Sequence, residues 1–280
     1  MCLILLAWQA HPEYPLIVAA NRDEFFDRPT ASAQFWPGNP ALLAGRDLLA
    51  GGTWLGITRN GRFAALTNYR EVKERPSPPP ALSRGRLVSD FLQDSGSAPA
   101  YLAALAAHAD DYQAFNLICG SLADGLWYYS NRDQNGGFSA VKPAKALGPG
   151  IYGLSNNLLD TPWPKVAQGK SALARALATL PREAPLFELL RDDHTHADDQ
   201  LPRTGISLEW ERALSAAFIR APHYGTRSST VLLCDRRQVI SFDEQSYRPD
   251  GATGTAETAG MPPAVSQRSR FRFRLDTDAC

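Results

Sequence analysis

The sequence has no excess charge of either sign. Its 280 residues contain 29 Lys and Arg against 29 Asp and Glu, so the formal net charge is zero. A protein that binds nucleic acid through a broad basic surface carries a clear excess of cations. We therefore expect no nucleic-acid partner for this chain.

Cysteine is scarce, and its spacing forms no recognisable framework. The four cysteines are Cys2, Cys119, Cys234 and Cys280. None belongs to a C-x-x-C pair, so the spacing indicates neither a zinc site nor a set of disulfides. Free thiols are typical of a reducing compartment, and we expect the protein in the cytoplasm.

Long apolar runs are also missing. The apolar start, residues 1–6, is far shorter than the roughly 20 apolar residues that a membrane-spanning helix needs. No basic segment precedes it, and Glu13 follows without a cleavage-like site. We expect neither a transmembrane segment nor a signal peptide.

The composition that remains is that of a globular protein. Hydrophobic residues make up 44% and charged residues 21% of the chain, and we interpret 1–280 as a single domain. The Asn60-Gly61 pair between two apolar runs predicts a hairpin. The expected strands are 2–9, 15–21, 42–47, 53–58, 63–68, 115–121, 126–130, 151–155, 230–234, 239–242 and 268–275. The expected helices are 82–93, capped by Ser83, and 98–109, 164–180, 186–191 and 208–217.

The order of these elements indicates the fold class. Strands lead the chain, helices fill its middle and strands close it, which favours an α+β layered protein over alternating βαβ units. Residues 25–40 are rich in proline and aromatics and predict a loop. Residues 71–80 are charged and then proline-rich, and 251–267 predict a flexible loop before a final strand. That strand, 268–275, alternates Arg with Phe and Leu, as an edge strand does.

Cys2 is the candidate nucleophile. Removal of Met1 would give Cys2 a free α-amine with a pKa of about 7.7–8, next to a thiol with a pKa of about 8.5. An N-terminal nucleophile thus brings its own base. Asp23 could hold the amine and Arg22 could favour the thiolate. The alternative interpretation is a buried strand in which Cys2 is simply a small apolar residue.

Four polar clusters sit at the ends of apolar strands and could converge on Cys2 if those strands lie in neighbouring sheets. Their amides and guanidinium groups could donate hydrogen bonds to an oxyanion, although such residues also form turns. His194 and His196 are metal-ligand types, but the surrounding run is acidic and predicts a solvated loop rather than a metal site. The clusters are Asn21-Arg22-Asp23-Glu24, Thr67-Asn68-Tyr69-Arg70, Ser155-Asn156-Asn157 and Thr226-Arg227-Ser228-Ser229.

These clusters and several neighbouring segments resemble the NRDE family, also called the transport and Golgi organisation protein 2 family. The matches occur in the same order along most of the chain. The matching segments are Met1-Cys2, Ala20-Asn21-Arg22-Asp23-Glu24-Phe25, Arg28-Pro29, Gly51-Gly52-Thr53-Trp54-Leu55-Gly56, Leu66-Thr67-Asn68-Tyr69-Arg70, Gly153-Leu154-Ser155-Asn156 and Tyr224-Gly225-Thr226-Arg227-Ser228-Ser229-Thr230.

The family is similar to the N-terminal nucleophile hydrolases, and this resemblance implies a four-layer αββα sandwich. Relatives such as bile salt hydrolases, penicillin V acylases and acid ceramidase cleave non-peptide amide bonds with an N-terminal cysteine. Carried over to this chain, Cys2 would be the nucleophile and Asn156 an oxyanion donor. Asn68 would be a second donor, and Arg227 a cation near the thiolate.

One departure concerns the second strand. The acylases place Arg and Asp three residues apart, whereas here Arg22 and Asp23 are adjacent and would face opposite sides of an ideal strand. Either the strand is bulged, or the pair facing Cys2 is Asn21 with Asp23, or Arg22 with Glu24. The acidic partner of the amine is therefore either Asp23 or Glu24.

Two functions follow from the resemblance. The first is hydrolysis of the C–N amide bond of a small acylated substrate by Cys2, which needs no cofactor. The alternative is a non-catalytic protein on the same scaffold that binds and traffics haem or acyl-CoA and lipid, since the family is linked to both. The expected partner is a small amide, acyl or haem ligand.

Overall fold

The computed structural model describes residues 2–71, 82–134, 136–137, 143–247 and 264–276, which form two antiparallel sheets and their flanking helices. Sheet A has the strand order β10-β1-β2-β11-β12-β13. Its strands are β1 Cys2–Trp8, β2 Leu16–Phe25, β10 Gly150–Leu154, β11 Tyr224–Cys234, β12 Val239–Tyr247 and β13 Val265–Arg274. Sheet B has the order β3-β4-β5-β6-β7-β8-β9. Its strands are β3 Thr30–Trp36, β4 Asn39–Asp47, β5 Leu55–Thr58, β6 Arg62–Asn68, β7 Phe115–Ser121, β8 Gly125–Ser130 and β9 Lys145–Ala146.

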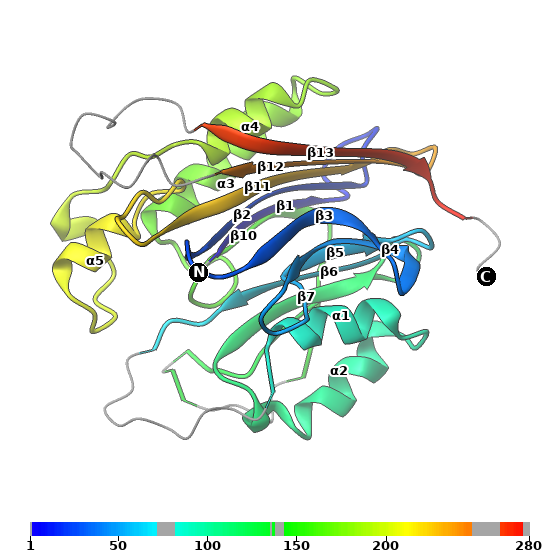
Figure 1. The fold of residues 1–280 in the computed structure, drawn as a ribbon, viewed down its shortest axis with the longest axis horizontal. Coiled ribbons are helices and arrows are strands. Elements are labelled where there is room, and N and C mark those ends of the chain that lie inside the picture. Colours follow the sequence, from blue (N-terminus) through cyan, green and yellow to red (C-terminus); the bar gives the residue numbers. More distant parts are fainter. Residues whose placement is uncertain (1, 72–81, 135, 138–142, 248–263, 277–280) are drawn as a thin grey trace.

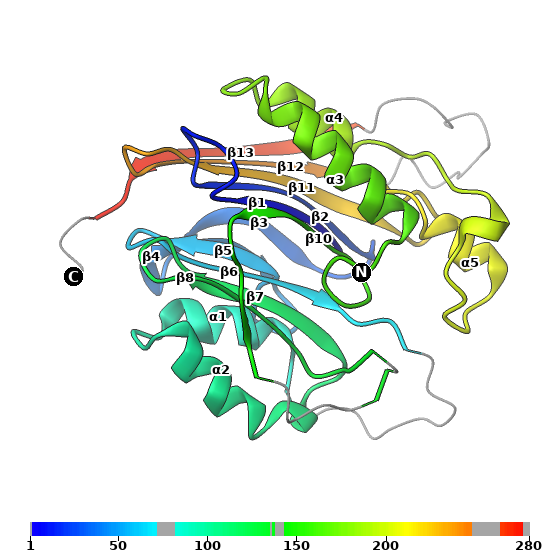
Figure 2. The ribbon, with the colours of Figure 1, turned by 180° about the vertical axis from the view of Figure 1, so that it is seen from behind.

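The two sheets stack face to face, and helices cover their outer faces (Figures 1 and 2). Helices α3 and α4 lie on sheet A, and α1 and α2 lie on sheet B. This is the expected four-layer αββα arrangement. The helices are α1 Gly85–Gln93, α2 Ala98–Ala106, α3 Pro164–Leu177, α4 Ala184–Leu190 and α5 Leu208–Ala213, with short 3-10 turns at Ala109–Asp111 and Asp198–Gln200.

Strand β1 shows how the sequence builds these layers. Its even residues, including Ile4 and Leu6, pack in the core between the sheets, and its odd residues, including Leu3 and Leu5, pack against α3 and α4. Successive side chains of a strand point to opposite faces. Because both faces of β1 are covered, the strand is a continuous apolar run rather than an alternating one.

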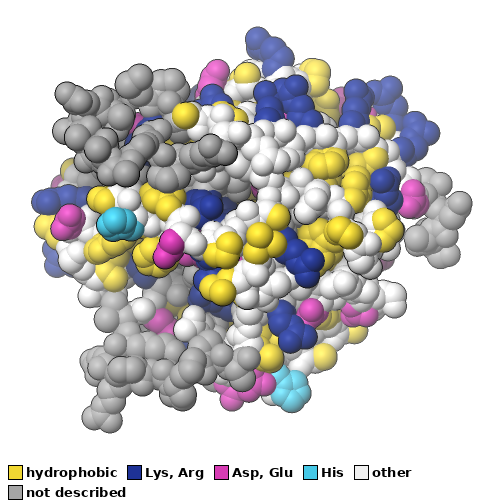
Figure 3. All heavy atoms as spheres, viewed as in Figure 1, with side chains coloured by type: hydrophobic (Ala, Val, Ile, Leu, Met, Phe, Trp, Pro, Cys, Tyr) yellow, Lys and Arg dark blue, Asp and Glu magenta, His cyan; other side chains and the backbone are white. Residues whose placement is uncertain are grey.

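Most of the expected elements are confirmed. Gly61 adopts φ +80° at the turn between β5 and β6, the conformation that the Asn60-Gly61 pair predicts. Strand β13 is the edge strand of sheet A, with its arginines exposed; basic side chains gather along this edge at the upper right of Figure 3. Within the described ranges, no helix combines the length and apolar content needed to cross a bilayer.

Some expectations differ from the structure, and others fall outside the described residues. The loop expected over 25–40 is wrong, because it contains β3 and the start of β4. Ser83 does not cap α1; the residue at the cap position is Arg84, without a side-chain cap bond. Residues 72–80 and most of 251–267 lie outside the described residues, and β13 begins at Val265, within the second of these segments.

Strands β2 and β11 extend further than expected into two of the polar clusters, which changes where these clusters lie. Strand β2 continues to Phe25 and β11 begins at Tyr224. The clusters that start at Asn21 and Thr226 therefore lie inside adjacent strands, not at the strand ends. Their side chains consequently have fixed faces, which decides what each residue can reach.

Candidate functional site

A cavity of about 280 Å³ opens beside Cys2, between the start of β1 and the loops of sheet B. Its wall combines charged side chains with Trp54 and Leu66. Four of the six residues expected at the site line it, together with Glu24. The lining residues are Cys2, Arg22, Asp23, Glu24, Arg28, Asp47, Ala50, Thr53, Trp54, Leu66, Asn68, Leu82, Ser83, Arg84, Gly85 and Gln113.

Cys2 and Arg22 share one face of sheet A. They are direct partners in the β1–β2 ladder, with no irregularity between these strands. Directly opposed residues of an antiparallel pair project to the same side. Since Ile4 on that side belongs to the core between the sheets, the Cys2 and Arg22 side chains face the space between the sheets.

Arg22 is held in place by an aromatic ring from the other sheet. Its guanidinium carbon lies 4.4 Å from the centroid of the Trp54 ring, at the start of β5. The side chain is buried, and its Nη1 has no hydrogen-bond partner among the described residues. A buried guanidinium with an unused donor is suited to bind an anion or a developing oxyanion.

Asp23 faces the opposite side, toward the helices, and is also buried. Its Oδ1 accepts a 2.7 Å hydrogen bond from the Thr226 hydroxyl. Burial raises the pKa of the Asp23 carboxyl, while the positive charge of Lys165 lowers it. Burial also raises the pKa of the Cys2 thiol, and the Asp23 carboxylate raises it further.

Glu24 lies on the same face of β2 as Arg22, at the rim of the cavity. Its Oε2 is 3.9 Å from Arg28 Nε, and Arg28 also binds Asp47 at 2.7 Å. The strand is therefore not bulged at this point, and the residues that share the face of Cys2 are Arg22 and Glu24. The bulge is in the neighbouring strand, between Thr226 and Ser228.

Asn68 and Asn156 are in contact but play different parts. Asn68 lies at the end of β6 and lines the cavity. Asn156 does not line it; this residue is fully buried, and its Nδ2 donates to the backbone oxygen of Asn68 at 2.9 Å. Among the described residues, no hydrogen bond engages the side-chain amide of Asn68.

Arg227 does not line the cavity. It occupies the bulge of β11, and its Nη1 donates to the backbone oxygens of Phe25 at 2.7 Å and Arg28 at 3.1 Å. These bonds fix the turn that follows β2. Burial lowers the pKa of the Arg227 guanidinium, and the charge of Arg22 lowers it further.

Side-chain hydrogen bonds join the four polar clusters around β1 and β2. Ser229 Oγ bonds to Asn21 Oδ1 at 2.6 Å, and Ser155 Oγ donates to the backbone oxygen of Cys2 at 3.2 Å. Asn21 Nδ2 also donates to the backbone oxygens of Leu190 and Ala217, each at 2.8 Å. The four clusters therefore lie together around β1 and β2. Many of their side chains hold the strands in place, however, and do not line the cavity.

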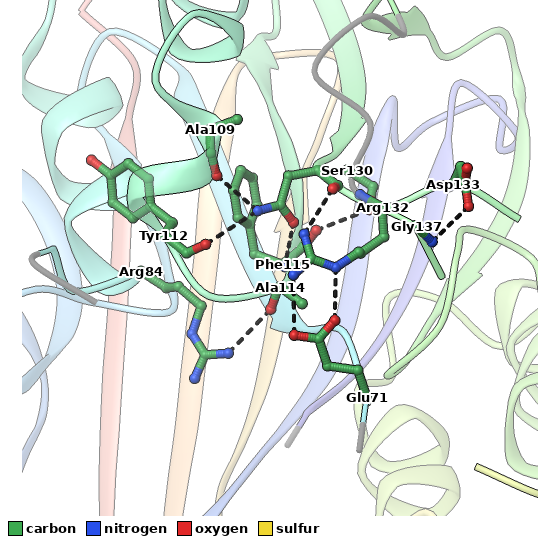
Figure 4. Close-up of polar contacts among 11 residues, drawn as sticks. Glu71, Arg84, Ala109, Tyr112, Ala114, Phe115, Ser130, Arg132, Asp133 and Gly137 are labelled. Atoms are coloured by element: carbon green, nitrogen blue, oxygen red, sulfur yellow. Dashed lines mark hydrogen bonds and ion pairs between the residues drawn. The ribbon is translucent and has the colours of Figure 1, made fainter. Parts of the chain in front are cut away.

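Arg84 is a cavity residue that the sequence did not single out. Its Nη1 donates to the backbone oxygen of Ala114 at 3.1 Å, and the same corner holds a Glu71–Arg132 ion pair at 2.7 Å (Figure 4). Burial lowers the pKa of Arg84, and the charges of Glu24 and Cys2 raise it. In the sequence, Arg84 was noted only as a neighbour of Ser83 at the expected start of a helix.

The histidine pair does not form a metal centre within the described part of the chain. The His194 and His196 rings lie 5.5 Å apart at nearly a right angle. No group of three or more His, Cys, Asp or Glu side chains in the described ranges could hold a metal ion. Burial lowers the pKa of His196.

Comparison with solved structures gives an N-acylethanolamine-hydrolyzing acid amidase ortholog from Caenorhabditis elegans. It is 12% identical with a TM-score of 0.42, and the match covers 83% of this chain and 92% of that one.

Comparison of the sequence gives far stronger similarity. The chain is 38% identical to the transport and Golgi organization protein 2 homolog of Bos taurus, over 99% of this chain and 100% of that protein. It is 36% identical to the Mus musculus homolog, over 88% of this chain and 93% of that protein. The model of the family described as Transport and Golgi organisation 2 matches residues 1–249. A family match over residues 1–249 and 38% identity to a full-length relative place this chain in the transport and Golgi organisation 2 family.

Proposed function

We propose that this protein is an amidohydrolase in which Cys2 attacks the C–N amide bond of a small acylated substrate. The observation that carries the proposal is the shared cavity of the Cys2 thiol, the Arg22 guanidinium and the Asn68 amide. These groups supply a nucleophile, a cation and a neutral hydrogen-bond donor. Removal of Met1 is part of the proposal, because only then does Cys2 carry a free amine.

The thiol needs activation. Burial raises the pKa of Cys2, so a base must take its proton at neutral pH. The α-amine of a processed Cys2 is such a base, with an ordinary pKa of about 7.7–8. Arg22, the direct ladder partner of Cys2, favours the thiolate once it has formed. Asp23 is the proposed partner of the amine, because its charge acts on Cys2 from within the buried site.

The reaction runs in two steps. The thiolate adds to the carbonyl carbon, the C–N bond breaks, and the leaving nitrogen takes the proton from the α-ammonium. The amine then removes a proton from water, which adds to the thioester and releases the acid and the thiol. Asn68, and the unused Nη1 donor of Arg22, stabilise the oxyanion in both steps.

Asn156 and Arg227 do not line the cavity but hold backbone segments that do. Asn156 holds the backbone at Asn68, so it positions the donor rather than contacting the oxyanion. Arg227 holds the turn that carries Arg28 at the rim of the cavity. The cavity of about 280 Å³ and the apolar side chains of Trp54, Leu66 and Leu82 fit a small acyl group.

The test is cleavage of a panel of N-acyl amides by the natural protein and by Cys2→Ala and Cys2→Ser. Both variants should retain the fold by circular dichroism and lose turnover. The matched control is Cys119→Ala, which changes a buried thiol in the core between sheet B and its helices and should retain activity. Cleavage that persists without Cys2, or its absence from the natural protein across the panel, contradicts the proposal.

The same experiment separates hydrolysis from ligand binding. A protein that only carries haem would show a Soret shift on titration with haem, lost in Cys2→Ala, and would cleave no amide. A protein that only carries acyl-CoA would bind it without consuming it. Either result would replace the hydrolase with a binding protein on the same scaffold.

A further inference from the structure

Lys165 is a buried lysine close to the proposed site. It is the second residue of α3, and its exposed fraction is 3%. Helix α3 lies on the outer face of sheet A, where Gly169 packs on Leu5 of β1. This is the face of sheet A toward which Asp23 points.

The ammonium group of Lys165 has no hydrogen-bond partner among the described residues. Removing a charged amine from water without such partners costs several kcal/mol, and an apolar side chain of similar length would avoid the cost. The start of α3 also carries the positive end of the helix dipole, which disfavours a cation. Packing alone therefore gives no reason for a lysine here.

The charged and titratable groups around Lys165 come from every element packed against it. Arg70 and Glu211 form a buried ion pair at 2.7 Å, so these two charges largely offset each other. Among the charges that act on Lys165, that of Asp23 raises its pKa most. The groups whose charges act together with that of Lys165 are Asp23 on β2, Cys2 on β1, Arg70 after β6, Glu211 on α5 and His196 after α4.

We propose that Lys165 is a positioning residue that keeps the Asp23 carboxylate ionised from the helix side of sheet A, so that Asp23 can hold the α-amine of Cys2. This assignment rests on the proposed function. Thr226 fixes one oxygen of Asp23 and the lysine supplies the compensating charge. The nucleophile and its support thus lie on opposite faces of one sheet.

The pKa shifts of Asp23 and Lys165 have the direction that this role requires. Lys165 is the largest influence that lowers the pKa of Asp23 against its burial. Burial lowers the pKa of Lys165 itself to about 8. The ammonium therefore persists through neutral pH and is lost as the pH rises through about 8, and its support of the carboxylate is lost with it.

The test measures the Asp23 carboxyl directly. The protein is labelled with aspartate carrying ¹³C in the side-chain carboxyl, the Asp23 signal is assigned by its loss in Asp23→Asn, and its titration is compared between the natural chain, Lys165→Met and Lys165→Arg. We expect the pKa of Asp23 to rise by about one unit or more in Lys165→Met, as when a nearby opposite charge is removed, and to return toward the natural value in Lys165→Arg. The acidic limb of kcat/KM should move with it.

The matched control is Lys170→Met in the same helix. Lys170 is partly exposed and pairs with Asp160 at 2.6 Å, so its removal should not move the Asp23 titration. An unchanged Asp23 pKa in Lys165→Met, or an equal shift in Lys170→Met, overturns the proposal. If no variant cleaves an amide but the Asp23 shift occurs, the electrostatic assignment stands and the proposed hydrolysis fails.

Discussion

Asn68 and Asn21 show that two asparagines from the segments that match the family have different roles. The Asn68 amide lines the cavity without an internal partner in the described structure, whereas Asn21 lies on the other face of its strand and binds two backbone oxygens and Ser229. Residue type alone does not tell a cavity residue from a structural one. The face of the strand on which the side chain lies distinguishes them, and that face follows from the strand register.

We expect Asn68→Ala to lower kcat by about 10²–10³-fold, which is the usual effect of deleting one oxyanion donor. KM should change little, because the bond is strongest in the transition state. Steady-state kinetics on a cleaved N-acyl amide measure both constants. Asn39→Ala, at the turn between β3 and β4, is the control, and equal losses in both variants would rule out the oxyanion role.

Asn21→Ala should affect stability instead of catalysis. It leaves the buried backbone oxygens of Leu190 and Ala217 without their donor. The loss should be roughly 2–4 kcal/mol of unfolding free energy, measured by urea titration. Turnover per folded molecule should be close to that of the natural chain; a loss of kcat at unchanged stability would instead make Asn21 part of the reaction.

At the scale of elements, the start of α1 and the loop before β5 form one wall of the cavity. Thr53 N donates to Gly85 O at 3.1 Å, and the two backbones touch at Gly52. A side chain at Gly52 would bring its Cβ within 2.6 Å of Gly85 O. Both segments contribute lining residues, so their contact sets the shape of the cavity.

We therefore expect Gly52→Ala to displace the start of α1, lower stability by about 1–3 kcal/mol and reduce Cys2-dependent cleavage more than tenfold. Thermal unfolding and kinetics on the same preparation measure the two effects. Gly38→Ala is the matched control, because a Cβ there would meet nothing within 4 Å. Activity and stability equal to the control would show that this backbone contact does not shape the site.

The elements were predictable where local chemistry decides them. Asn60-Gly61 predicts the β5–β6 turn because a glycine tolerates the positive φ of that position. Strand β3 was missed because Pro29 and Pro37 flank it and its pairing with β4 is irregular at two places. Its strand conformation is set by pairing across the sheet, a signal that local sequence does not contain.

At the scale of the whole molecule, side chains also join the two sheets at their edges. The buried Glu244 of β12 accepts a 2.6 Å hydrogen bond from the Ala33 N–H of β3. Ser32 and Ser246 bond beside it at 2.9 Å. Burial raises the pKa of Glu244 above its ordinary value near 4.5.

The raised pKa of Glu244 predicts how the stability of the protein changes with pH. A folded carboxyl with a raised pKa holds its proton to higher pH than the unfolded chain does, so stability falls as pH rises above about 4.5 through the folded pKa. We expect Glu244→Gln to fall less over that window, by about 1.4 kcal/mol for each unit by which the folded pKa exceeds the ordinary one. Urea unfolding at a series of pH values measures the difference, and identical slopes for the two proteins would refute it.

The layered fold could be predicted, and so could the charged and amide residues nearest Cys2 in the cavity wall, but their cross-sheet partners could not. Strand patterns and family motifs placed Cys2, Arg22 and Asn68 together. No local pattern indicates that the Trp54 ring covers Arg22 or that the charge of Lys165 acts on Asp23, because these pairs come from distant segments of different elements. Pro164 and the apolar spacing of α3 predicted the helix but not a buried charge in it.

The central claim is that Cys2 acts as the first residue of the mature chain, and the intact mass of the natively produced protein tests it most directly. The account predicts a mass lower than that of the encoded chain by one methionine residue, with Cys2 at the amino terminus. A native protein that retains Met1 in full would contradict the account, because the amine that activates the thiol would then be absent.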